Sequence, residues 1–291
     1  YAEWGEDYDE YVAKARVSMS GPPTFKAEAQ FARMTETAVT ARLEGIPLPA
    51  LESELEDPET PMRLVNYETQ LREGYRMGAH SRPAARPDAD EAAQRRTLAM
   101  TCLDADEPLE GHNLSGADLS GLSFAGKELG AVWFEGADLR GCDFTGASVA
   151  GGVLTRARLD GAIFRDANLS RVNLGSTDLA GADFEGADFD DAILVGASFA
   201  GARLVRANLA EVDFLSLDLG AVDLTEANLR DATLYQTKLD GARLVGADLT
   251  GATLIECTLE DADLRRAVRV GASLITCVGR KASFCEAQLS K

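Results

Sequence analysis

A large apolar residue at every fifth position dominates the sequence from Leu109 to Leu289. Counting in steps of five gives 37 positions, of which 35 hold Leu, Phe or Val, while Arg269 and Gly279 differ. Alanine stands two residues earlier in 22 of the 37 units. A period of five matches neither an α-helix nor a β-strand. The chain is therefore expected to turn a corner every five residues and to stack its turns as a solenoid around one continuous core.

The phenylalanines indicate how many units close one coil. Nine Phe occupy large positions, and five of them are separated by multiples of 20 residues: Phe124, Phe144, Phe164, Phe184 and Phe284. Coils of 20 residues would place such rings one above another about 4.8 Å apart, where offset stacking adds about 0.5–1.5 kcal/mol. The repeats then predict a stack of about nine coils, on the order of 43 Å long.

The unit A-(D/N)-L-x-x, as in Ala117-Asp118-Leu119 and Ala247-Asp248-Leu249, resembles the repeat of the pentapeptide-repeat family. The resemblance extends over residues 107–291. It implies a mainly β fold, a right-handed quadrilateral β-helix in which four pentapeptides make each coil. It also implies that Leu or Phe is the large inward residue of each unit and that alanine is the small one.

Residues 1–106 follow a different pattern, and we expect a small α-helical segment over residues 1–79. Three stretches have apolar residues at helical spacing: 1–19, 26–43 and 63–77. Residues 80–106 are expected to form a Pro/Arg-rich linker and the entry to the first coil, with an imperfect opening turn near Leu98, Met100 and Leu103. Such short helices bury little surface, so they are expected to pack on the coil or on an upstream domain.

Composition argues against several classes of protein. The net charge is −19, whereas binding to nucleic acid or to an anionic membrane depends on Lys and Arg. No apolar run approaches the roughly 20 residues that a membrane span needs. The two histidines, His80 and His112, and the five cysteines form no H-E-x-x-H or C-x-x-C motif. We therefore expect a non-enzymatic protein of the cytoplasm without a metal, cofactor or catalytic site.

Two cysteines, Cys257 and Cys277, replace the small inward alanine 20 residues apart. Adjacent coils would bring their Cα atoms to about 4.8 Å, a distance at which a disulfide can form. Two reduced thiols within the core are the favoured alternative.

One outward column of residues on the second face of the coil is apolar. The residue after the large one is small or polar in the first coils, as at Ser115 and Gly175, and apolar in the next five. We name these five the apolar stripe: Val195, Leu215, Tyr235, Ile255 and Ile275. A contiguous apolar strip usually marks a contact surface. Its predicted occupant is the chain's own amino-terminal helices, another protein, or a second copy in a homodimer.

A second candidate surface is acidic. Between Val172 and Ala202 the sequence holds six carboxylates and no Lys or Arg. We name these six the acidic belt: Asp178, Asp183, Glu185, Asp188, Asp190 and Asp191. The belt is either a solvated surface or a site for a basic partner.

The stripe and the lack of catalytic motifs favour a non-catalytic scaffold or adaptor that binds a partner protein. The chain starts at Tyr1 without Met, and bacterial pentapeptide-repeat chains with an added module resemble secretion-associated adaptors, so we expect the carboxyl-terminal part of a longer bacterial protein. The alternative is a DNA mimic that binds DNA gyrase, as the family resemblance also implies. Residues 107–291 hold 28 acids and 17 bases, a net charge of about one per 4 Å against about one per 1.7 Å in duplex DNA. This comparison favours the adaptor.

Overall fold

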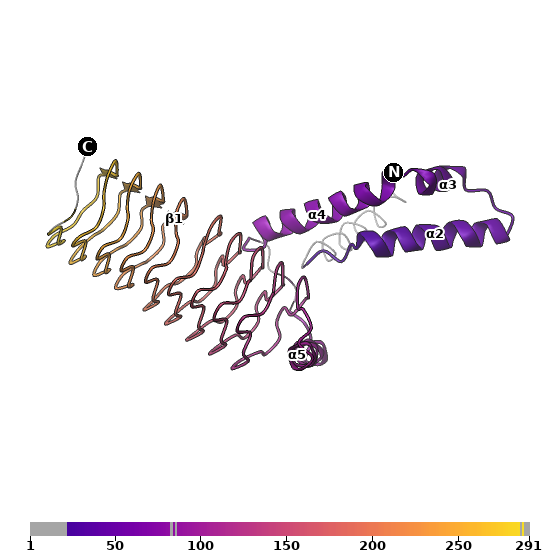
Figure 1. Ribbon diagram of the computed structural model, residues 1–291, viewed down its shortest axis with the longest axis horizontal. Coiled ribbons are helices and arrows are strands. Elements are labelled where there is room, and N and C mark those ends of the chain that lie inside the picture. Colours follow the sequence, from indigo (N-terminus) through magenta and orange to yellow (C-terminus); the bar gives the residue numbers. More distant parts are fainter. Residues whose placement is uncertain (1–21, 82–83, 85, 286, 288–291) are drawn as a thin grey trace, which may run out of the picture. The chain divides into compact units, whose positions relative to one another are not determined.

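The computed structural model describes residues 22–81, 84, 86–285 and 287, and the chain divides into two units, Tyr1–Gly78 and Ala79–Lys291. The first unit consists of helices and the second of stacked coils preceded by one helix (Figure 1). None of the helices within the described residues is long and apolar enough to cross a membrane.

The first unit contains α2 (Ala27–Leu43), α3 (Pro49–Glu56) and α4 (Thr60–Gly78). Helix α2 packs along α4, and at one end of this pair the rings of Phe25 and Tyr67 meet edge to face with centroids 5.1 Å apart. An edge-to-face contact of this kind is favourable for aromatic rings and helps to fix the pairing of the two helices.

The helices predicted over residues 26–43 and 63–77 are confirmed by α2 and α4. Helix α3 was not predicted, because its prolines were interpreted as interruptions. Pro49 instead occupies the first helical position, where a missing N–H costs nothing. The helix predicted over residues 1–19 lies outside the described residues.

The second unit opens with helix α5 (Ala89–Asp104), where the sequence predicted an imperfect opening turn. The prediction was wrong because the sparse apolar residues of this stretch belong to a helix with one buried edge. The Asp88 carboxylate caps the helix by accepting a hydrogen bond of 2.8 Å from the Glu91 N–H. Ala99 and Cys102 are buried and join the core of the coils. Helix α5 therefore closes the amino-terminal end of the solenoid core.

Each coil of the second unit closes after 20 residues. The backbone pairs are parallel and join residues 20 apart, from Asn113 with Trp133 to Asp263 with Ser283. Most pairs are single bridges, but one face of the later coils forms a four-stranded parallel sheet. Its strands are β1 (Asp213–Leu215), β2 (Thr233–Tyr235), β3 (Thr253–Ile255) and β4 (Ser273–Ile275). The predicted 20-residue period is therefore confirmed.

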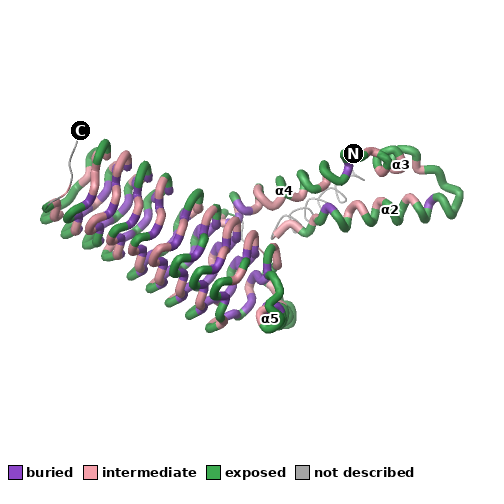
Figure 2. The backbone as a smooth tube through the Cα atoms, in the orientation of Figure 1, coloured by how far each residue is buried: buried purple, intermediate pink, exposed green. Residues whose placement is uncertain are grey.

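The core runs through the inside of the coils, where buried and exposed residues alternate along each face (Figure 2). The predicted stack of phenylalanines is present: ring centroids are 4.9 Å apart for Phe124 and Phe144, 4.5 Å for Phe144 and Phe164, and 5.1 Å for Phe164 and Phe184. Corner residues adopt positive φ, as at Gly161 (66°) and Arg156 (57°). The corners therefore use the left-handed region that glycine adopts most easily.

The backbone ladder is interrupted at one place, which we name the seam. Within residues 193–201 and 212–220, all of them described, no backbone hydrogen bond joins the two neighbouring coils. The pairs Ile193–Asp213 and Ser198–Asp218 are missing from the series, whereas Arg203–Asp223 is formed. The seam therefore opens two of the four faces and leaves the other two closed.

Side-chain volume explains the position of the seam. Leu217 is buried at a corner where the coils before and after it place Ala197 and Thr237. The adjacent Val212 also replaces an alanine, and the inward Phe214 is among the largest buried side chains. Extra volume in a close-packed core displaces the backbone. We infer that Leu217 wedges the two coils apart.

Candidate functional site

The apolar stripe lies on the face that contains strands β1 to β4, which we name the stripe face. In each strand the central residue points into the core and its two neighbours point outward, so Leu215, Tyr235, Ile255 and Ile275 form one outward column. Val195 continues the column in the preceding coil. Val195, Leu215 and Ile275 are 44%, 50% and 50% exposed, and the other two are half-buried. The predicted stripe is thus a continuous apolar surface of the coil unit.

The same column is covered in the earlier coils by a segment of the coil unit itself. We name this segment the strap; its described residues are 79–81, 84 and 86–88. The Ala84 N–H donates to the Glu135 carboxylate at 2.8 Å. Arg156 donates to the carbonyl oxygens of Ala79 at 3.2 Å and His80 at 2.7 Å. Outward side chains of the coil therefore hold the backbone of the strap.

Two glycines allow the strap to lie close to the coil. A Cβ atom on Gly175 would be 2.3 Å from the His80 Cβ, and one on Gly116 would be 2.5 Å from the Pro87 Cδ. Gly175 has no positive φ, so the turn does not require glycine there, and the close approach of the strap does. The strap was expected to be a linker, and its path over the stripe face was not predicted from the sequence.

Polar groups border the stripe on both sides. A column of corner residues beside it is hydrogen-bonded from coil to coil: the Ser216 hydroxyl lies 3.5 Å from Gln236 Oε1, and Gln236 donates to the Glu256 carboxylate at 2.8 Å. The column on the other side holds Asp213, with Thr233 in the next coil. These columns present hydroxyl, amide and carboxylate groups to anything that covers the stripe.

The stripe face is also acidic. Its outward and corner positions between residues 191 and 276 hold five exposed carboxylates and no Lys or Arg: Asp191, Glu211, Asp213, Asp231 and Glu256. Arg171 of the preceding coil lies 3.8 Å from the Asp191 carboxylate. The face therefore combines an apolar centre with a border of unbalanced negative charge.

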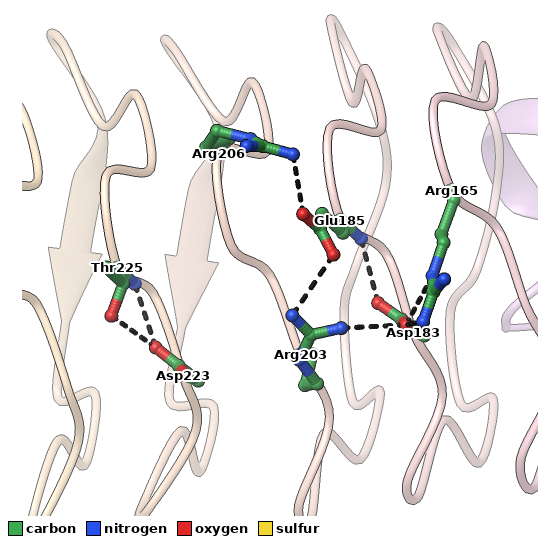
Figure 3. A network of polar contacts seen from close by, with 7 residues as sticks. All are labelled: Arg165, Asp183, Glu185, Arg203, Arg206, Asp223 and Thr225. Atoms are coloured by element: carbon green, nitrogen blue, oxygen red, sulfur yellow. Dashed lines mark hydrogen bonds and ion pairs between the residues drawn. The ribbon is translucent and has the colours of Figure 1, made fainter.

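The acidic belt is not one surface, because its residues wrap around several faces of the coil. Asp183 and Glu185 lie in an ion-pair network on a different face from the stripe (Figure 3). Arg203 donates to both carboxylates, at 2.8 Å and 3.1 Å. Arg165 donates to Asp183 at 2.8 Å, and Arg206 donates to Glu185 at 2.5 Å. Arginines of the coils on either side, outside the sequence window that defined the belt, thus offset the charge of these two acids.

Protonation follows from these contacts. Burial alone would raise the pKa of Asp183, but hydrogen bonds from Arg165 and from the Glu185 N–H, with the charge of Arg203, lower it below its ordinary value. Asp191 pairs with Arg171, and Asp188 accepts a hydrogen bond of 2.7 Å from Asn208. These contacts provide structural partners for much of the belt, whose role as a site for a basic partner stays a prediction.

The cysteines show no arrangement that suits catalysis or metal binding. All five are free thiols, including Cys257 and Cys277. Burial raises the pKa of Cys142 and of Cys257 to about 11, so both are protonated at neutral pH. Among the residues that the structure describes, no group of three or more His, Cys, Asp or Glu side chains could hold a metal ion.

Family comparisons agree with this architecture. Residues 167–244 match the family described as Pentapeptide repeat region. The family described as Pentapeptide repeats (8 copies) matches residues 128–166, 137–175, 227–266 and 242–278. Together the matches span residues 128–278, just over half of the 291 residues. The chain therefore belongs to the pentapeptide-repeat family, a β-helix family, and here carries an amino-terminal helical segment.

Several solved structures are similar to the chain. HetL, a pentapeptide repeat protein involved in heterocyst differentiation regulation in the cyanobacterium Nostoc, is 29% identical, with 62% of this chain and 81% of HetL covered and a TM-score of 0.32. Full-length QnrB1, a plasmid-mediated fluoroquinolone resistance protein, is 22% identical, with 53% and 91% covered and a TM-score of 0.31. No curated protein matches significantly. The family assignment rests on the sequence matches, because TM-scores this low do not establish a common overall structure.

Proposed function

We propose that this protein is a non-catalytic scaffold that binds a partner protein through the apolar stripe. One observation carries the proposal: apolar side chains stand at the same outward position in five successive coils, and three of them are at least 44% exposed. The part of the column that the strap covers instead holds Ser115, Glu135, Thr155 and Gly175. Large apolar side chains were therefore retained where the strap is absent, which supports a binding role for them.

The pentapeptide repeat supports the non-catalytic part of the proposal. Thirty-seven units without an insertion provide no loop on which a cleft could form. The five free cysteines suit a reducing compartment, so we place the protein in the cytoplasm. We further infer a right-handed stack of about nine coils that serves, in the manner of a secretion-associated adaptor, as one part of a longer bacterial protein. The amino-terminal helical segment as an intramolecular cover of the stripe, and a homodimer through it, are the alternatives to a separate partner.

Site-specific photo-crosslinking in living cells tests the proposal. A benzophenone amino acid is placed at Tyr235 on the stripe and, in a control, at Val245, which points outward from the face of the ion-pair network. We expect a discrete crosslinked protein from position 235 and not from position 245. Mass spectrometry of the adduct distinguishes a partner from the chain itself. The proposal fails when position 235 crosslinks only within one chain, or no more than position 245.

A further inference from the structure

The strap shows how the stripe face holds polypeptide. His80 lies against Gly175 and Pro87 against Gly116, so the strap crosses three coil spacings within seven residues. Three spacings measure about 14 Å, which such a length of extended chain covers easily. The coil side chains that hold it, Glu135 and Arg156, bond to its backbone groups. This mode of binding recognises an extended main chain.

The uncovered part of the stripe face has the same layout with different side chains. Gln236 and Glu256 occupy the corner position that Arg156 occupies under the strap, and Leu215 occupies the position of Glu135. Five coils of stripe extend about 19 Å, the length of about six extended residues. The uncovered part thus combines apolar contacts along its centre with hydrogen-bonding groups along its border.

The seam adds backbone groups to this surface. It separates the coil of Val195 from that of Leu215, and the hydrogen bonds between Leu194, Gly196 and their counterparts in the next coil are missing. Peptide N–H and C=O groups without a partner favour pairing with another extended chain. The stripe therefore contains main-chain donors and acceptors in addition to its side chains.

We propose that the stripe face binds an extended segment of a partner protein in which apolar side chains alternate with Lys or Arg. This inference rests on the proposed function and specifies the chemistry of the partner. Alternation follows from the narrow apolar column, because every second side chain of an extended segment points the same way. Basic residues follow from the five carboxylates and the absence of Lys and Arg on this part of the face.

The same charges argue against the other occupants. Two copies of the chain joined through this face would bring five carboxylates against five, and like charges at an interface are unfavourable. An anionic membrane would be repelled in the same way. A basic segment instead converts the acidic border into favourable pairs.

Fluorescence anisotropy with defined peptides tests the inference on the full chain. The probe is a labelled peptide of alternating Val and Lys that is long enough to span the stripe. We expect saturable binding, at least about tenfold weaker binding of the Val/Glu peptide, and a similar loss for a peptide of Lys and Ser without apolar residues. Equal binding of the Val/Lys and Lys/Ser peptides would show attraction by the overall negative charge and would overturn the inference.

Matched variants locate the binding. Leu215→Ser/Ile255→Ser is expected to weaken the Val/Lys peptide at least about tenfold, whereas Val245→Ser on another face has no effect. Glu211→Lys is likewise expected to weaken it, whereas Glu226→Lys, at an equivalent corner of the opposite edge, is not. Unchanged binding by the stripe variants overturns the inference, as does a wild-type dimer in sedimentation velocity that Leu215→Ser dissociates.

The crosslinking experiment separates this inference from the proposed function. A partner that crosslinks at Tyr235 while the Val/Lys peptide fails to bind would leave the scaffold function intact and refute only the extended basic segment. Failure of the crosslink would refute the scaffold function itself.

Discussion

At the scale of single residues, the most consequential departure from the repeat is Leu217. It stands at a corner where the neighbouring coils have Ala197 and Thr237, and the seam opens around it. The sequence shows the substitution plainly. Its effect on the ladder depends on how much the coils can move, which only the packed structure reveals.

Leu217→Ala is expected to close the seam and to cost little stability. Removing a buried leucine usually costs about 2–5 kcal/mol, and Leu239→Ala, at a regular large position, should cost that much. At Leu217 the cost is offset by the restored ladder. The free energy of unfolding and amide exchange at Gly196 and Gly201 measure the two effects. Equal costs for both variants, with unchanged exchange at the glycines, would contradict the wedge.

Two buried thiols make stability depend on alkaline pH. The pKa of Cys142 and of Cys257 rises from 9.0 to about 11 on burial. A raised pKa in the folded state means that their contribution is fully present below pH 9 and is lost as the pH rises to about 11, by at most about 2–3 kcal/mol per thiol. Cys142→Ala/Cys257→Ala should remove this part of the pH dependence, as thermal unfolding across this range will show. A constant difference between wild type and variant would contradict it.

At the scale of elements, the strap is what divides the stripe face into a covered and an uncovered part. Its described residues were predicted as a linker from their Pro and Arg content. Their contacts with Glu135 and Arg156 join positions about 50 and 76 residues apart in the sequence, so no local pattern predicts them. Gly175 was the available clue, because it is a glycine at an outward position that the corner does not require.

Gly175→Ala is expected to displace the strap without unfolding the coil. The new Cβ would be 2.3 Å from the His80 Cβ, closer than any real contact, so the strap has to move. Amide exchange at Ala84, whose N–H donates to Glu135, should then accelerate. Gly130→Ala is the control, because its Cβ would be no closer than 3.6 Å to any neighbouring atom. Unchanged protection of Ala84 would show that the strap is not held as described.

At the scale of the whole molecule, charge distribution argues for the adaptor over the DNA mimic. The coil region has a net charge of −11, from 28 acids and 17 bases, and arginines pair with acids across neighbouring coils. DNA presents an unbroken series of phosphates, about one per 1.7 Å. The pairing in the network of Arg203 therefore lowers the local likeness to DNA in part of the belt that most resembled it.

We accordingly expect that micromolar protein leaves DNA supercoiling by gyrase unchanged. A supercoiling assay on relaxed plasmid measures this, with Arg165→Gln/Arg203→Gln as a variant in which the carboxylates of Asp183 and Glu185 lose partners. Inhibition by the wild-type chain would restore the gyrase alternative. Inhibition by the variant alone would show that the arginines suppress the resemblance.

The sequence by itself determined the coil, because a strict five-residue period leaves one way to bury its large and small residues together. It also determined which outward residues share a face, since residues 20 apart must stack. The seam, the strap and the pairing of the acidic belt were decided by tertiary structure. Each depends on side chains from different coils or from a distant segment, and the free energy of such contacts depends on packing distances that no local pattern contains.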